Sequence, residues 1–209
     1  MPESAKEGTQ TLKKRPQAGI LPGELGAALQ RYSRRYSEED GTVRRMLDLL
    51  NAGDDAFSRN FFTPGHFTGS AWVIDPLEER VLLTHHRRLD MWLQLGGHGE
   101  GELDILGIAL REAVEESGIP QSHLKLGYDD LFDIDVHAIP PGRNEPAHSH
   151  FDIRFLFTSD SRREVVVSDE SHDLSWVGLD ALEAYTQEES MLRMRDKSRH
   201  LLDALKRDP

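Results

Sequence analysis

The middle and C-terminal parts of the chain alternate between apolar and polar residues with the two-residue period of β-strands. Asp75-Pro76-Leu77 separates two such runs and predicts a hairpin, and a proline-rich loop at 140–146 separates another pair. The predicted strands are residues 67–74, 80–84, 91–95, 131–139, 150–157, 165–167 and 174–177.

Apolar residues spaced by three and four positions predict helices around these strands. The predicted helices are residues 23–36, a segment that ends at Leu50, a segment that ends before Gly118, 180–185 and 188–205. Ser37 is the expected N-cap of the second helix, with Thr42 as the alternative, because hydroxyl side chains cap helix N-termini well. Paired strands with helices before, between and after them predict an α+β fold, arranged as an α/β/α sandwich.

The pattern also divides the chain into segments. Residues 1–22 are polar and are expected to form a disordered leader. Residues 23–65 form an N-terminal helical extension, which we expect to act as a lid or to mediate a homodimer. Residues 66–209 form the main domain.

Composition narrows the functional classes. The net charge of −12 argues against binding to a nucleic-acid polymer or to an anionic membrane surface, because both require a basic surface. No apolar run reaches the length of a membrane span, so no membrane partner is expected. The chain has no cysteine, which excludes disulfides and cysteine nucleophiles and makes a cytoplasmic location the expectation.

A cluster of glutamates is the strongest chemical signal in the sequence. Glu112, Glu115 and Glu116 stand at i, i+3 and i+4, so a helix places them on one face, where they repel one another. A bound Mg²⁺ would remove this conflict, because hard cations prefer carboxylate oxygens and substrate phosphates. The alternative is a solvated acidic face with Arg111 as a local ion-pair partner.

The residues around this cluster favour the metal interpretation. A glycine-rich loop at 96–101 precedes the helix, and Gly118 ends it. Leu106 and Leu110 lie on the side opposite the glutamates, whereas Ile105 and Ile108 lie on the glutamate side. The helix is therefore expected to be covered on both sides.

The stretch 96–119 resembles the Nudix box, Gly-x5-Glu-x7-Arg-Glu-U-x-Glu-Glu-x-Gly-U, where U is aliphatic. The C-terminal half of the box matches from Arg111 to Ile119. The N-terminal half departs, because eight residues instead of seven separate Glu102 from Arg111. The chain is thus similar to the Nudix hydrolase superfamily, and the resemblance implies an α/β/α sandwich with a mixed sheet.

The resemblance also implies a reaction, the metal-dependent hydrolysis of a diphosphate linkage in a nucleoside diphosphate linked to another moiety. Mg²⁺ or Mn²⁺ would be the cofactor, and a small phosphorylated molecule would be the substrate. The candidate catalytic residues are Arg111, Glu112, Glu115, Glu116 and Glu170, and the candidate metal ligands are Gly96, Glu112, Glu115 and Glu116. Arg111 would orient a glutamate, and Glu112 or Glu170 would take the proton from water.

A second constellation follows from strict alternation on strand 150–157. The aromatic and aliphatic side chains take one face and a set of polar side chains takes the other. This pattern resembles a bacterial group of Nudix proteins with a Gly-Gly-His loop and a His-x-His-x-Asp-x-Arg-Phe strand. The candidate substrate-binding residues are His98, His137, His148, His150, Asp152 and Arg154.

The polar face has several interpretations from sequence alone. It is an exposed sheet face with ordinary ion pairs, a set of substrate contacts, or a transition-metal site. We expect it to line the pocket that holds Glu112. For the whole protein, the alternatives to hydrolysis are a non-catalytic Nudix-like nucleotide or sugar sensor, a scaffold protein, or an isomerase of the isopentenyl-diphosphate type, which the missing cysteine disfavours.

Overall fold

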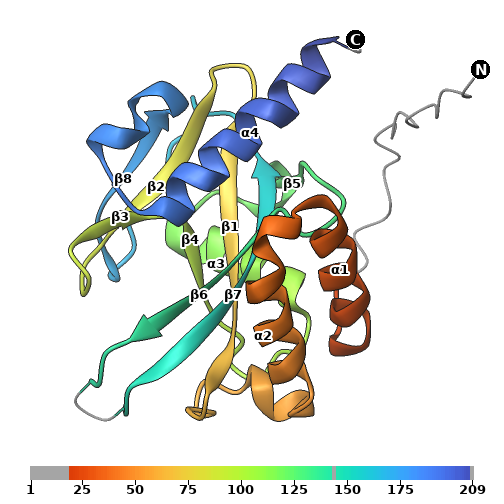
Figure 1. Cartoon of the computed structure of the whole chain (residues 1–209). Helices are drawn as coiled ribbons and strands as arrows, with labels where there is room; N and C mark the ends of the chain where they lie inside the picture. Colours follow the sequence, from red (N-terminus) through yellow and green to blue (C-terminus); the bar gives the residue numbers. More distant parts are fainter. Residues whose placement is uncertain (1–18, 143–144, 208–209) are drawn as a thin grey trace, which may run out of the picture.

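A mixed sheet lies at the centre of the protein (Figure 1). The computed structural model describes residues 19–142 and 145–207. β1 and β7 pair in parallel, and the other described pairs are antiparallel. The strands are β1 (Gly65–Asp75), β2 (Arg80–His86), β3 (Met91–Leu93), β4 (Leu95–His98), β5 (Lys125–Leu126), β6 (Asp133–Ile139), β7 (His148–Thr158) and β8 (Ser171–Gly178).

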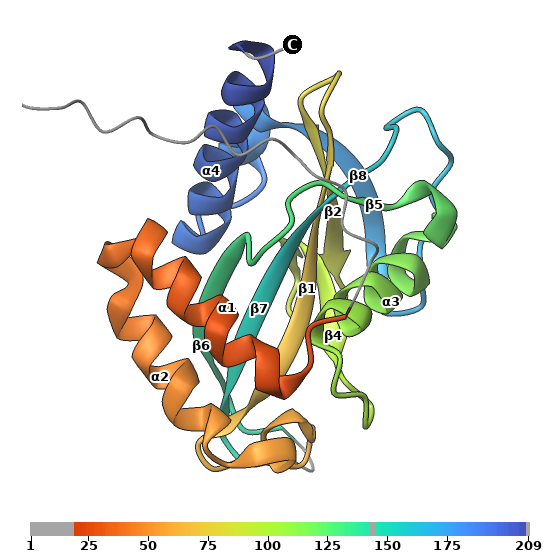
Figure 2. The same cartoon turned by 90° about the vertical axis from the view of Figure 1, so that its right-hand side faces the viewer.

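Helices cover both faces of this sheet (Figure 2). The α-helix that carries the glutamates lies against one face, the C-terminal helix lies against the other, and the N-terminal pair packs beside β6 and β7. The α-helices are α1 (Pro22–Arg35), α2 (Asp40–Leu50), α3 (Ile105–Ser117) and α4 (Glu189–Arg207), and the 3₁₀ turns are η1 (Ser37–Glu39), η2 (Gly53–Phe57), η3 (Gln121–His123) and η4 (Leu179–Ala184). The predicted α+β sandwich with a mixed sheet is confirmed.

The alternation of β1 divides the interior into two cores. Phe67 and Ala71 join the apolar cluster that contains the buried residues of α3, α1 and α2. Trp72 and Ile74 point to the other side and join a cluster that contains Met191 and other residues of α4. Because β1 is central, both of its faces are buried along its whole length.

Two glycines allow α3 to lie unusually close to the sheet. Gly69 of β1 pairs with Gly97 of β4, so both positions face α3 without a side chain. A Cβ atom at Gly69 would lie 2.8 Å from the carbonyl oxygen of Ile105 and 3.0 Å from the backbone nitrogen of Ala109. The backbone of α3 therefore contacts the backbone of β1, and this contact fixes the distance between the helix and the glycine loop.

The N-terminal helices are part of the main core. Leu25 and Leu29 of α1 and Met46 of α2 are fully buried in the same cluster as the residues of α3. The apolar faces that suggested a dimer contact or a lid are thus used within the chain, and the structure gives no support to a homodimer through these helices. Residues 1–18 of the expected leader lie outside the described residues, whereas Ile20 donates its backbone N–H to Asp104 at 2.7 Å.

Local predictions fail in two places. Residues 165–167 form no strand, because Val166 donates its backbone N–H to the carbonyl of Ser117 and runs past the end of α3. Ser37 and Thr42 do not cap α2, which begins at Asp40 directly after the turn η1 and has Glu39 at its N-cap without a side-chain capping bond. Among the described residues, no helix has the combined length and apolar character that crossing a membrane requires.

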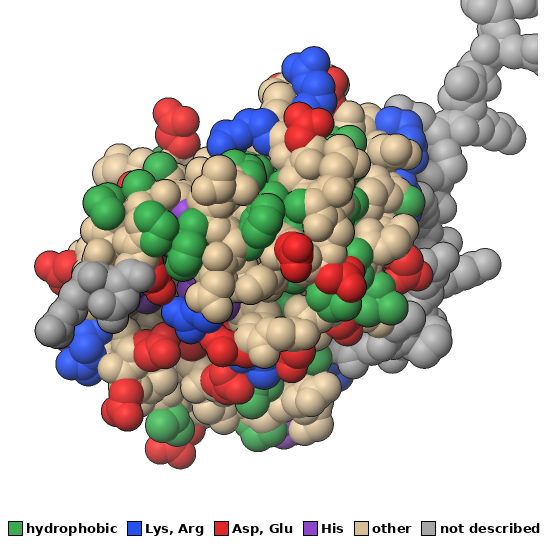
Figure 3. Space-filling view, turned by 90° about the horizontal axis from the view of Figure 1, so that it is seen from below, with side chains coloured by type: hydrophobic (Ala, Val, Ile, Leu, Met, Phe, Trp, Pro, Cys, Tyr) green, Lys and Arg blue, Asp and Glu red, His purple; other side chains and the backbone are tan. Residues whose placement is uncertain are grey.

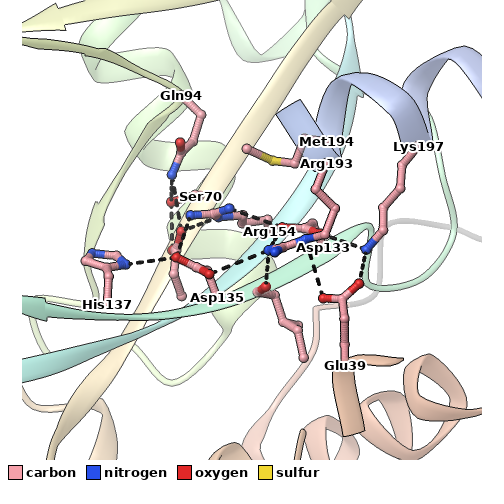
Figure 4. A network of polar contacts seen from close by, with 12 residues as sticks. Glu39, Ser70, Gln94, Asp133, Asp135, His137, Arg154, Arg193, Met194 and Lys197 are labelled. Atoms are coloured by element: carbon pink, nitrogen blue, oxygen red, sulfur yellow. Dashed lines mark hydrogen bonds and ion pairs between the residues drawn. The ribbon is translucent and has the colours of Figure 1, made fainter. Parts of the chain in front are cut away.

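A buried ion network lies on the α4 side of the sheet (Figure 4). Arg154 of β7 is 2 % exposed and donates to Asp152 at 2.7 Å and to Asp133 of β6 at 3.1 Å. Asp152 also accepts hydrogen bonds from the hydroxyls of Thr68 and Ser70 on β1. The pairing satisfies charges that could not otherwise be buried, because an isolated buried ion costs several kcal/mol.

The network extends to the N-terminal helices and to α4. Asp133 accepts from Arg193 at 2.8 and 2.9 Å and from Lys197 at 2.7 Å, both on α4. Lys197 also pairs with Glu39 at 2.7 Å, and the hydroxyl of Tyr32 donates to Glu39 at 2.8 Å and lies 3.3 Å from Asp133. Although burial alone would raise the pKa of Asp133, the surrounding Arg193, Arg154 and Lys197 hold it below its usual range.

We predict that Gly69→Ala lowers the free energy of unfolding by about 1–3 kcal/mol, the usual cost of overpacking a well-packed contact. The added methyl group meets backbone atoms of α3, which can move only with the helix. Gly178→Ala is the matched control, because a Cβ there has no neighbour within 4 Å. Urea unfolding of the wild type and both variants measures the difference, and equal effects of the two substitutions would contradict the close contact.

We also predict a specific dependence of stability on acid. Burial alone would raise the pKa of Asp135, but His137, Arg154 and Arg193 outweigh it and lower the pKa from 3.8 to about 2. The group is therefore more easily deprotonated in the folded state, and its contribution is present above its unfolded pKa and lost as the pH falls from 3.8 towards 2.

Accordingly, Asp135→Asn should be less stable than the wild type at neutral pH, and this difference should shrink between pH 4 and pH 2. Urea unfolding at a series of pH values provides the measurement. Asp203→Asn, at an exposed position of α4, is the control that should follow the wild type. A stability difference that stays constant between pH 4 and pH 2 would show that the charge of Asp135 does not stabilise the folded protein.

Candidate active site

The glutamate helix has different structures at its two ends. Asp104 is the N-cap residue of α3 but makes no side-chain capping bond, whereas Gly118 ends the helix in a left-handed conformation, with φ of 69°. Ile105, Ile108 and Ala109 on the glutamate side are fully buried, as are parts of the opposite side. The prediction of a helix covered on both sides is confirmed, because one side packs on the sheet and the other on neighbouring segments of the core.

Arg111 lies at the centre of the charged side chains of α3. Its guanidinium donates to Glu112 at 2.9 Å, to Glu115 at 3.1 Å and to the carbonyl oxygen of His98 at 2.7 Å. It also lies 3.6 Å from the carboxylate of Glu102, the residue whose spacing departs from the Nudix box. Arg111 therefore ties the helix to the end of β4 and holds two of the carboxylates in place.

Glu116 is the most buried of the three glutamates, at 5 % exposure. Its carboxylate accepts a hydrogen bond of 2.8 Å from the backbone N–H of Gly96 at the start of the glycine loop. This hydrogen bond joins the helix to the glycine loop through the N–H of Gly96. The role of Gly96 as a metal ligand stays a prediction. By contrast, the side chain of Glu115 is 58 % exposed and faces water.

Burial changes the acidity of these carboxyl groups. It raises the pKa of Glu112 to about 7, although Arg111 acts in the opposite direction. It raises the pKa of Glu116 to about 8, although the hydrogen bond from Gly96 opposes the shift. Both shifts show that negative charge is costly at this position and that an added cation would be favourable.

Glu170 approaches the same group of carboxylates from the loop before β8. Its charge raises the pKa of both Glu112 and Glu116, so it lies within electrostatic range of them. The backbone carbonyl of Glu170 accepts a hydrogen bond of 2.9 Å from Arg87 at the end of β2, which holds this loop against the sheet. Glu170 therefore lies near the glutamates of α3, and the catalytic roles of Arg111 and of the four glutamates stay predictions.

The polar face of β7 lies on the opposite side of the sheet from the glutamates. The contact of Gly69 with α3 places Ile153, its parallel partner, on the α3 side, so Asp152 and Arg154 point away from α3. Glu112 lies on the α3 side, because its carboxylate lies 2.7 Å from where a Cβ of Gly97 would stand. The prediction that this face lines the pocket of Glu112 is wrong.

The interpretation of this face as an exposed surface with ordinary ion pairs holds for the ion pairs of Arg154 but is wrong for the exposure of Asp152 and Arg154. Asp152 and Arg154 are buried and have all their charge taken up by protein partners, which leaves neither free for substrate. Alternation revealed which residues share the face, but the central position of β7 means that both of its faces are covered.

The remaining candidate residues form a group of imidazoles on that same side. His98 and His150 approach with their Nε2 atoms 3.2 Å apart, and the rings of His148 and His137 lie 5.2 and 5.4 Å from that of His150. His98 belongs to both sides, because its carbonyl binds Arg111 while its ring meets His150. Substrate contact by these histidines stays a prediction.

Sequence reasoning missed several residues of this region. His66 joins the imidazole group, but it lies one residue before the predicted start of the first strand. Gln94 donates to Asp152, and Arg193 and Lys197 of α4 bind Asp133. The i, i+4 spacing of the two basic residues on α4 was an available signal, because it places both on one helix face.

Comparison with known proteins identifies the family of this chain. A model of the NUDIX domain matches residues 66–197, which is more than half of the 209 residues. The chain belongs to the NUDIX family. Family membership supports the prediction of an enzyme that acts on acid anhydrides in phosphorus-containing compounds.

Solved structures show the same Nudix fold. The chain is similar to an Ap4A hydrolase from C. elegans solved as a binary complex, with 16 % identity, a TM-score of 0.54, and coverage of 66 % of this chain and 97 % of that chain. A second structure of C. elegans Ap4A hydrolase gives 18 % identity and a TM-score of 0.50, covering 65 % and 97 %. A NUDIX-family hydrolase from Clostridium perfringens is 27 % identical, with a TM-score of 0.49 and coverage of 65 % and 97 %.

The two Ap4A hydrolase structures cover about two thirds of this chain, and the match to the family model begins at residue 66. No curated protein matches the sequence. The substrate of this Nudix protein therefore has to be inferred from its own residues.

Proposed function

We propose that this Nudix protein is a metal-dependent hydrolase that cleaves a diphosphate linkage in a nucleoside diphosphate linked to another moiety. The observation that carries the proposal is the group formed by Glu112, Glu115, Glu116 and Glu170 beside the glycine loop. Arg111 is the cation that binds two of these carboxylates. The similarity to Ap4A hydrolases supports one part of this proposal, namely that the bond that is broken is a phosphorus anhydride.

The donor atoms fit a hard divalent cation such as Mg²⁺ or Mn²⁺. Glu116 is a buried carboxylate that accepts a hydrogen bond from an uncharged N–H, and burial raises the pKa values of Glu112 and Glu116. Arg111 now lies between Glu112 and Glu115. Binding an ion there requires these two side chains to exchange Arg111 for the metal.

When bound, such an ion supplies charge neutralisation for phosphate oxygens and lowers the pKa of a coordinated water. The protein groups have separate tasks. The N–H of Gly96 holds Glu116 in one orientation, and Arg111 links the helix to the carbonyl of His98 so that the glutamates face the glycine loop. Glu170, on a loop beside the helix, is our proposed acceptor of the proton from the attacking water.

The alternative is a Nudix-like protein that binds a nucleotide or sugar without turnover. Glu112, Glu115 and Glu116 all keep an ionisable carboxylate. This favours hydrolysis, because binding a nucleotide or sugar without turnover does not require three ionisable groups there. The deciding experiment is a hydrolysis screen with Mg²⁺ and Mn²⁺ over nucleoside triphosphates, ADP-ribose, dinucleoside polyphosphates and nucleotide sugars. Binding of a nucleotide by the wild type without release of product would favour the sensor.

We predict that Glu115→Gln and Glu116→Gln each lower kcat/KM by at least about 100-fold. Mutation of residues that only hydrogen-bond to metal ligands already lowers metal affinity or activity by about 10–100-fold. Each substitution keeps the volume of the side chain and removes one charged oxygen. Glu38→Gln, exposed on η1, is the matched control and should retain full activity. Full activity in both α3 variants would place the metal elsewhere and contradict the proposal.

We further predict that Mg²⁺ stabilises the folded protein. An ion present at about five times its Kd contributes about 1 kcal/mol, which raises Tm by about 2–4 °C for a chain of this size. The shift should be smaller in Glu116→Gln, because that variant lacks a buried ligand. Thermal unfolding with MgCl₂ or with NaCl of equal ionic strength measures the effect, and identical melting curves would show that the glutamates form no preformed site.

A further inference from the structure

A second group of possible metal ligands lies away from the glutamates. One ring nitrogen from each of His66, His148 and His150 lies within 4.8 Å of the others, and they are the one such group among the described residues. They come from the beginnings of β1 and β7, which pair in parallel with His66 opposite His150. The group lies on the side of the sheet opposite to α3.

The hydrogen bonds around two of these rings fix their tautomers. The Nδ1 of His66 lies 3.2 Å from the carbonyl oxygen of Phe61, and the Nδ1 of His148 lies 2.9 Å from that of Pro146. A carbonyl oxygen can only accept, so each Nδ1 carries the proton and each Nε2 carries a lone pair. Backbone carbonyls hold metal-binding histidines in this same way.

His66 supplies the decisive observation. It is 1 % exposed, and its Nε2 is a buried polar atom with no hydrogen-bond partner. The lone pair of this buried nitrogen points among the other imidazoles and accepts no hydrogen bond. Buried polar atoms usually have a hydrogen-bond partner. The rings of His98, His148 and His150 surround it, with centroids 4.9–5.1 Å away.

The surrounding atoms suit a transition metal better than Mg²⁺. The donors are neutral nitrogens, which favour Zn²⁺ and its neighbours, whereas Mg²⁺ prefers oxygen. Tetrahedral Zn²⁺ holds its nitrogen ligands about 3.3 Å apart, given Zn–N distances of about 2.0–2.1 Å. The Nε2 atoms of His98 and His150 are 3.2 Å apart, so a fourth imidazole lies at the distance of such a coordination edge.

Charged side chains of both signs lie near the approach to the group. Glu100 and Glu145 act on His98, and so does Arg59, which pairs with these two glutamates at 2.9 and 3.4 Å.

We propose that His66, His148 and His150 bind a transition-metal ion of the Zn²⁺ class, with His98 beside the remaining coordination position. This site is distinct from the glutamate site, since it lies on the other side of the sheet and uses nitrogen donors. It differs from the set suggested by sequence, because Asp152 is committed to Arg154 and His66 takes its place. On the face seen in Figure 3, histidine surfaces are small and recessed between other side chains.

The test uses the full-length, untagged protein, stripped with chelator and titrated with Co²⁺ and then Zn²⁺ in the presence of millimolar Mg²⁺. We expect about one Co²⁺ per chain with the visible absorption of a nitrogen-coordinated ion, displaced by Zn²⁺. His66→Gln and His150→Gln should each lose this band at micromolar metal. Glu116→Gln should keep it, which separates this site from the proposed hydrolytic one.

His200→Ala, at an exposed position of α4, is the matched control and should bind as the wild type does. Circular dichroism checks that the variants fold. If His66→Gln does not fold, titration of the wild type followed by NMR of the imidazole signals decides, with changes expected at His66, His148 and His150. Absence of metal binding by the folded wild type, or equal binding in both histidine variants, overturns the proposal whatever the outcome of the hydrolysis assay.

Discussion

The close approach of two backbones, at paired glycines of β1 and β4, sets the geometry on which the rest of this protein depends. With no side chain at Gly69 or Gly97, α3 rests directly on the sheet. That distance lets Glu116 reach the N–H of Gly96 and lets Arg111 reach the carbonyl of His98. Any side chain at these glycines would separate the carboxylates from the loop they face, so the acidic helix and the glycine loop have to be understood as one unit.

The opposite side of the same sheet buries charged side chains. Buried strands usually carry apolar side chains on both faces, but β7 buries an arginine and an aspartate instead. They are tolerated because Arg154 bridges Asp152 and Asp133, and because α4 contributes Arg193 and Lys197 to the second aspartate. Beyond this network, towards the start of β7, the polar residues are imidazoles, which can be buried without charge. One sheet thus separates the glutamates on its α3 side from the imidazoles on its other side.

Sequence alone predicted much of this arrangement. Helical spacing placed the glutamates together, and alternation showed which residues of β7 share its polar face, whereas the register of β7 with β6 comes from the structure. It could not show which layer covers each face, because that depends on contacts between residues far apart in the chain. The polar side of β7 was therefore directed to the wrong side of the sheet, and Arg193 and Lys197 were not connected with it. His66 was missed for a simpler reason, since strand ends are poorly defined by pattern.

The ion network has a consequence for how the chain is divided. Similarity to the family begins at residue 66, but Tyr32 and Glu39 before that boundary share Asp133 and Lys197 with β6 and α4. A fragment that starts at residue 66 would leave the ammonium group of Lys197 without Glu39 and would expose the apolar residues that Leu25 and Leu29 now cover. The limit of family resemblance therefore falls inside one continuous core, which the first helices share with the sheet.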